Sequence, residues 1–175
     1  VEEGVVWHAL DTCIQGATQL APWVREHVPI TLQDVHRGKT LRQVAQNLAD
    51  VLQGGDTIVA HSVAFDLNLV LAKAARIHRI IDTRALRRIL ECPRFCTMHC
   101  GYSRATFGKQ PRLDQLCRHF EVSLQGAHDA RADSAALARC VAEAWRRGVM
   151  LEEPRSPRRA DFFDKPLGGA TPAPH

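Results

Sequence analysis

The sequence lacks long apolar runs. Its longest apolar stretches fall far short of the roughly 20 residues that span a bilayer, and no secretory signal opens it. We therefore expect a protein that does not interact with membranes. Its 175 residues, of which 45% are hydrophobic, suit one α/β core followed by a tail.

Cysteine pairs of the C-x₂-C kind, which are typical of zinc sites, are also absent. The six cysteines are Cys13, Cys92, Cys96, Cys100, Cys117 and Cys140. Three of them recur every four residues around His99, which is not zinc spacing. We interpret the cysteines as reduced residues, several packed as small apolar side chains, and expect an intracellular location in the cytoplasm, nucleus or nucleoid.

The sequence has no strong excess of charge of one sign. The formal net charge is +4 and the isoelectric point is near 8.9. These values are compatible with a polyanionic partner, but many proteins that never bind nucleic acid share them.

Two short motifs carry most of the functional information. The first, His61-Ser62-Val63-Ala64-Phe65-Asp66, follows a strand-like apolar run at 57–60. The second, His128-Asp129-Ala130-Arg131-Ala132-Asp133, opens a helical pattern that extends to Arg147. Together they supply two carboxylates and a histidine, which suit binding of Mg²⁺ and removal of a proton from water. This combination is typical of a metal-dependent phosphodiesterase.

Both motifs resemble those of a known family, the DEDDh exonucleases, which are DnaQ-like, proofreading-type 3′→5′ exonucleases. Residues 54–66 resemble the family's second motif, H-N-x-x-F-D, and residues 126–133 match its third motif, H-x-A-x-x-D, at every defining position. The resemblance covers roughly residues 5–147. It implies an RNase H-like α/β layered fold, in which helices flank a mixed central sheet. It also implies hydrolysis of DNA or RNA from the 3′ end, with release of 5′-mononucleotides.

The resemblance implies roles for individual residues. Asp66 and Asp133 would be ligands of two Mg²⁺ or Mn²⁺ ions about 4 Å apart. His128 would be the general base, since an imidazole with a pKa near 6.5 accepts a proton at neutral pH. The wall near the terminal nucleotide would be shaped by His61, Ser62 and Phe65. The implied partners are single-stranded DNA or RNA 3′ ends, together with a polymerase or another replication or repair protein.

The first motif of the family, D-x-E, occurs nowhere in the sequence. The nearest string is Asp11-Thr12-Cys13, but a thiol is a poor Mg²⁺ ligand, and only 54 residues lie between Asp11 and Asp66. We therefore interpret Asp11 as a loop residue. Residue 1 is Val and the first methionine is Met98. We expect the first strand of the fold to lie upstream of Val1, so that residues 5–10 form the second strand.

Hydrophobic periodicity predicts the remaining elements. Helices are expected at 40–53, from a Ser62 cap to residue 75, at 84–90, at 113–120 and at 132–147, with a short strand at 57–60. These elements place an N-terminally incomplete exonuclease domain at residues 1–150. Residues 151–175, rich in proline and arginine, are expected to be a disordered tail. Its Phe162-Phe163 pair is interpreted as solvated rather than as a clamp-docking motif.

Two alternatives remain open. The missing D-x-E motif favours a catalytically inactive exonuclease-like domain that acts as a nucleic-acid or protein binding module. The other alternative is an RNA-processing nuclease of the same superfamily, because discrimination of the 2′-hydroxyl depends on pocket shape. A DEDDy enzyme is disfavoured, since that subclass has Tyr at the position of Asp129.

Overall fold

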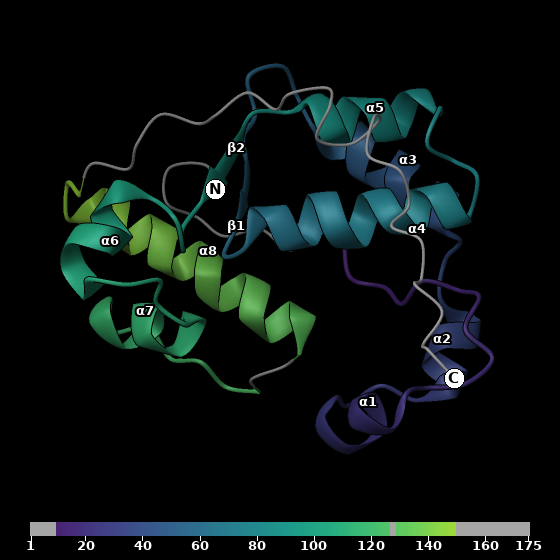
Figure 1. Cartoon of the computed structure of the whole chain (residues 1–175), viewed down its shortest axis with the longest axis horizontal. Coiled ribbons are helices and arrows are strands. Elements are labelled where there is room, and N and C mark those ends of the chain that lie inside the picture. Colours follow the sequence, from purple (N-terminus) through teal and green to yellow (C-terminus); the bar gives the residue numbers. More distant parts are fainter. Residues whose placement is uncertain (1–9, 127–128, 150–175) are drawn as a thin grey trace, which may run out of the picture.

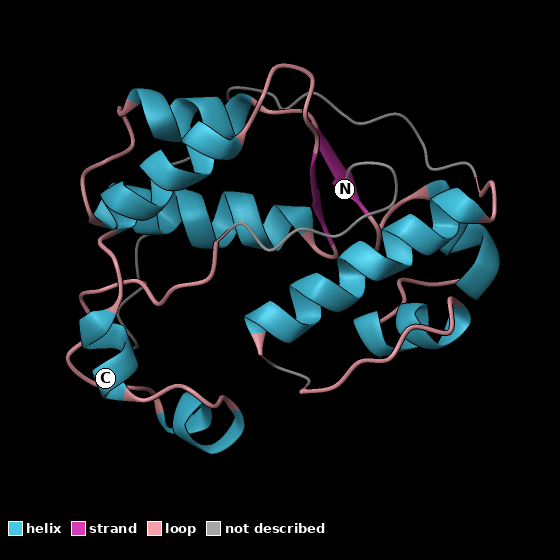
Figure 2. Ribbon diagram, turned by 180° about the vertical axis from the view of Figure 1, so that it is seen from behind, coloured by secondary structure: helices cyan, strands magenta, loops and turns pink. Residues whose placement is uncertain are grey.

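The computed structural model describes residues 10–126 and 129–149. Two short strands lie between two groups of helices (Figure 1), and helix dominates this part of the chain (Figure 2). The elements in order are α1 (Pro22–His27), α2 (Leu32–Arg37), α3 (Leu41–Val51), β1 (Ile58–Ala60), η1 (Ala64–Leu71), α4 (Ala72–Ile77), α5 (Arg84–Glu91), β2 (Arg94–Cys96), α6 (Gly101–Phe107), α7 (Leu113–His119) and α8 (Ala130–Arg146). None of the described helices is long and apolar enough to cross a membrane.

The sheet within the described residues is a parallel pair, in which Ile58, Val59 and Ala60 of β1 face 94–96 of β2. A parallel bridge between Ile14 and Lys39 is the one further strand-like pairing in this part of the chain. The larger mixed sheet that we expected is not found there. Of the strand expected at residues 5–10, all but Leu10 lies outside the described residues.

The helix starts follow local capping chemistry. Thr31 and Thr40 each form a capping box with the residue three positions on, Asp34 or Gln43, which satisfies backbone N–H groups that a helix leaves unpaired at its start. The predictions for α3, α5 and α7 are confirmed to within about two residues.

Two predicted helix starts were wrong in detail. The Ser62 side chain does not cap a helix: η1 begins at Ala64 as a π-helix with no side-chain cap, and the Ser62 carbonyl accepts from the Asp66 N–H. Helix α8 begins two residues earlier than expected, because the Asp129 side chain accepts from the Arg131 N–H and caps it.

The buried residues form two separate clusters. The first core joins α3, η1, α4 and α5 through Leu41, Ala45, Ala49, Leu52, Val63, Leu67, Ala72, Ala75, Ile80, Ala85, Leu86, Ile89 and Leu90. The second core joins α7 and α8 through Leu116, Cys117, Phe120, Ala136, Leu137, Cys140 and Ala144. In Figure 1 the helices of the two cores lie on opposite sides of the strands.

Candidate active site

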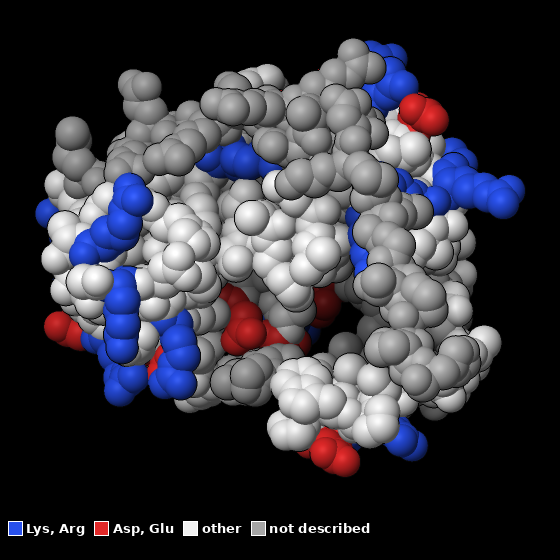
Figure 3. All heavy atoms as spheres, viewed as in Figure 1, with Lys and Arg blue, Asp and Glu red and all other residues white. Residues whose placement is uncertain are grey.

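A cleft of about 640 Å³ lies between the two cores. One wall comes from β1 and the start of η1, and the other comes mainly from α8. Its lining residues are Thr57, Val59, Ala60, His61, Ser62, Asp66, Leu113, Ala130, Asp133, Ser134, Leu137, Ala138 and Val141. Figure 3 shows acidic side chains inside a hollow between the two groups of helices, with Lys and Arg on the outer faces to either side. The two carboxylates predicted as metal ligands, Asp66 and Asp133, therefore line the same cleft.

Asp66 lies in the first turn of η1, where the helix dipole favours a negative charge. Its N–H donates to the Ser62 carbonyl over 3.0 Å. The residue as a whole is exposed, but partial burial of the carboxyl group raises the pKa of Asp66 above its ordinary value. Burial has this effect because it disfavours the charged form. A bound cation would offset that cost.

Asp133 lies in the first turn of α8 and is half-buried. Its N–H donates to the Asp129 carbonyl over 2.9 Å. Asp129 itself accepts from the Arg131 N–H over 3.0 Å with its side chain. Asp129 thus fixes the start of the helix that presents Asp133.

The ring of His61 is held at both nitrogens. Nε2 donates to the Pro111 carbonyl over 3.0 Å, so Nδ1 accepts from the hydroxyl of buried Thr97 over 2.9 Å. Burial lowers the pKa of His61, which favours the neutral ring. His61 lines the cleft but has both nitrogens engaged, so it contributes shape rather than hydrogen bonds to a ligand.

Of the other three predicted site residues, one lines the cleft. Ser62 lines the cleft. Phe65 is 54% exposed and does not line it. His128, the predicted general base, lies outside the described residues.

Asp11 and Cys96 each lie close to a side chain of another residue. Asp11 lies in an irregular segment, as expected, but its carboxylate is 3.6 Å from the Arg131 guanidinium at the start of α8. Cys96 lies 3.1 Å from Nδ1 of His99. Within the described residues, no group of three or more His, Cys, Asp or Glu side chains could hold a metal ion.

The oxygen ligands that the cleft offers suit one Mg²⁺ ion. This ion prefers oxygen ligands, and one or two carboxylates together with substrate phosphates and water commonly suffice. Asp66 and Asp133 provide such a pair, although a second ion would need ligands from outside the described residues.

Comparison with known proteins assigns the chain to a family. The model of a family described as exonuclease, of the RNase T type, matches residues 9–141. The match covers both motifs and most of the described chain. No curated protein and no solved structure matches the chain significantly.

Proposed function

Because the chain belongs to the exonuclease family, we propose that it is a metal-dependent 3′→5′ exonuclease that releases 5′-mononucleotides from single-stranded DNA or RNA. The observation that carries this proposal is the meeting of Asp66 and Asp133 in one cleft. They come from motifs far apart in the sequence and from helices of different cores.

The proposed mechanism begins with the charge of the substrate. A phosphodiester is anionic, so it repels hydroxide unless its charge is offset. Asp66 and Asp133 would hold the divalent cations, which supply that positive charge and help to activate the attacking water. His128 would take the proton of the water. A neutral His61, tied to Thr97 and Pro111, would keep the end of β1 in place at the wall of the cleft that receives the terminal nucleotide.

The test of this proposal is a degradation assay. A single strand labelled at its 5′ end should shorten as a ladder when incubated with the protein and Mg²⁺ or Mn²⁺. Blocking the 3′ end should stop the reaction, and EDTA should abolish it. Cleavage that persists in EDTA, or that begins internally, would contradict the proposal.

The second candidate function is that of a binding module without catalysis. It is favoured by the absence of D-x-E from the sequence and by the lack of a three-ligand metal group among residues 10–126 and 129–149. In the same assay, this candidate predicts that the strand is bound and stays intact at every Mg²⁺ and Mn²⁺ concentration.

A further inference from the structure

A second pocket lies on α8 beside the cleft. Its volume is about 490 Å³, within the range of small-ligand sites. We call it the outer α8 pocket; it is lined by Ser123, Gln125, Asp129, Arg131, Ala132, Ala135 and Arg139. Residues 130, 133 and 134 of the same helix line the cleft instead. The two hollows therefore lie on different faces of the first turns of α8.

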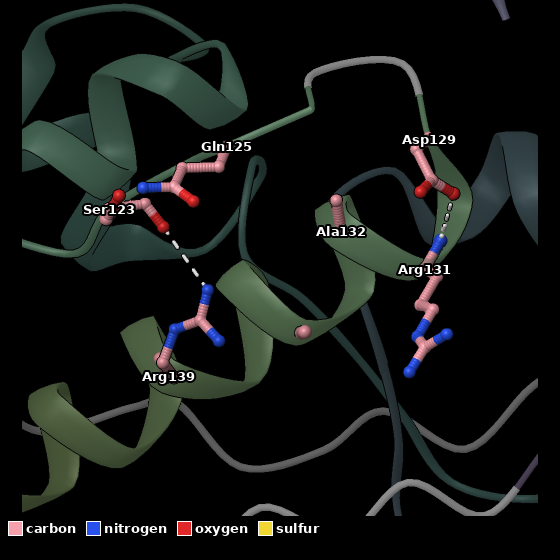
Figure 4. Close-up of a pocket in the computed structure, with 7 residues that line it drawn as sticks. Ser123, Gln125, Asp129, Arg131, Ala132 and Arg139 are labelled. Atoms are coloured by element: carbon pink, nitrogen blue, oxygen red, sulfur yellow. Dashed lines mark hydrogen bonds between the residues drawn. The ribbon is translucent and has the colours of Figure 1, made fainter. Parts of the chain in front are cut away.

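One end of the outer α8 pocket is rich in hydrogen-bond donors. Figure 4 shows Arg139, Ser123 and Gln125 grouped together at this end. The Arg139 guanidinium donates to the Ser123 carbonyl over 3.2 Å, and no carboxylate pairs with it within the described chain. The side-chain amide of Gln125 makes no hydrogen bond to another described residue. A guanidinium has five N–H donors, so most of those of Arg139 are available to a ligand.

The other end of the pocket does not cancel this positive charge. Asp129 is engaged by the N–H of Arg131, and the Arg131 guanidinium lies 3.6 Å from Asp11. Ala132 lies between the two ends (Figure 4) and carries no charge, and neither does Ala135, which also lines the pocket. Because Arg131 is paired with Asp11 and Asp129 lies at the same end, the positive charge of the pocket is that of Arg139, and the donor end suits an anionic oxygen group.

The position of the pocket relates it to the cleft. Arg139 follows Asp133 by six residues, which is about 9 Å along the helix axis. A strand whose terminal phosphodiester lies at Asp66 and Asp133 could therefore continue around α8 to Arg139.

We propose that the outer α8 pocket binds a backbone phosphate of the nucleic-acid strand, away from the bond that is cleaved. The Arg139 guanidinium and the Gln125 amide donate to the phosphate oxygens, and planar arginine suits this recognition. Such a contact positions the strand without reading its sequence. The inference rests on the proposed function, because it names the contact that holds the substrate of that reaction.

The experiment measures strand binding without hydrolysis. Fluorescence anisotropy of a labelled single strand in EDTA gives Kd over a series of salt concentrations. Arg139→Ala should weaken binding about tenfold and reduce the slope of log K against log salt by about one, as expected for the loss of one phosphate contact. Arg139→Lys should keep the slope and lose part of the affinity. The control is Arg146→Ala, which removes the same charge from the same helix at an arginine that pairs with Glu143, and it should bind within about twofold of the parent.

A second variant distinguishes the loss of a phosphate contact from a loss of folding. Arg139→Ala also removes the bond to the Ser123 carbonyl, whereas Gln125→Ala leaves it intact and should weaken binding about threefold. Thermal melting of both variants checks the fold.

The outcomes separate this inference from the proposed function. If the parent binds the strand and both Arg139→Ala and Gln125→Ala bind as tightly with the same salt slope, the inference is wrong and the function stands. If the parent does not bind any strand in EDTA, the inference is wrong, and the degradation assay with Mg²⁺ decides the proposed function. If free nucleoside 5′-monophosphate binding depends on Arg139 while strand binding does not, the pocket is a mononucleotide site and the strand contact is refuted.

Discussion

Asp66 and Asp133 each lie in the first turn of a helix. A carboxylate at that position stabilises a helix by about 0.3–1 kcal/mol through the dipole alone, so its position does not distinguish a structural from a metal-binding role. What favours a metal-binding role is that both side chains line one cleft, which stabilising two separate helices does not require. Metal titrations of single variants separate the two roles.

We predict that His128→Ala and Asp133→Asn differ in their response to metal. The first removes the proposed base and should lower turnover about 10²–10⁴-fold with little effect on strand binding. The second removes a charge but keeps the shape, so it should weaken metal binding. Activity measured across a Mg²⁺ titration checks this: excess Mg²⁺ should partly rescue Asp133→Asn only. Equal rescue of His128→Ala would show that His128 supports the metal site instead.

Cys13→Glu tests the interpretation of Asp11. The substitution makes residues 11–13 read D-x-E. We expect no gain in nuclease activity, because this segment is irregular and the Cys13 carbonyl is tied to the Lys39 N–H over 2.9 Å. Cys13→Gln is the matched uncharged control. A Mg²⁺-dependent rise of about tenfold in Cys13→Glu alone would mean that Asp11 belongs to the metal site.

At the scale of elements, α5 has one buried face and one exposed face. Ala85, Leu86, Ile89 and Leu90 are buried while its arginines are at the surface. Leu86→Ala should lower the free energy of unfolding by about 2–5 kcal/mol, because the first core cannot fully close around the missing volume. Arg87→Ala, which removes an exposed pair with Asp82, should change it by less than about 1 kcal/mol. Urea denaturation of both variants measures the difference, and similar values would contradict the assignment of the core.

Elements with a strong local signal could be predicted from the sequence, and those that depend on distant partners could not. Helix α3 has an apolar repeat at helical spacing, so its bounds could be predicted to within two residues. The π-helical start of η1 has no comparable signature, and a Ser62 cap was wrongly expected.

In the candidate site, too, features with a sequence motif could be predicted, and features that depend on distant residues could not. The motifs predicted that Asp66 and Asp133 would meet. The engagement of both His61 nitrogens was not predictable, because Thr97 and Pro111 are distant in sequence. Arg139 and Gln125 belong to no motif, so only the fold identifies the pocket that they line.

At the scale of the whole molecule, two cores of unequal size share one cleft. Asp66 is carried by an element of the first core and Asp133 by an element of the second. The affinity of the cleft for a metal ion therefore depends on how closely the two cores hold together.

We predict that Mg²⁺ stabilises the fold through these two residues. At an ion concentration 100 times Kd, binding to the folded state alone contributes about 2.7 kcal/mol. For a chain of this size, that corresponds to a rise in Tm of about 5–10 °C. Thermal melting with and without Mg²⁺ measures the rise, and the double variant Asp66→Asn/Asp133→Asn should abolish it. An equal rise in the double variant would place the ion elsewhere.

Because two cores share the cleft, a bound ion also affects how the protein unfolds. An ion bound to one carboxylate from each core would be a non-covalent cross-link between them. Without the ion, the cores could separate in a sub-global opening while the helices within each remain folded. With the ion, separation and unfolding would become a single cooperative event. Amide hydrogen exchange would then show β1 and the N-terminal turns of α8 exchanging early in EDTA and together with the core helices in Mg²⁺.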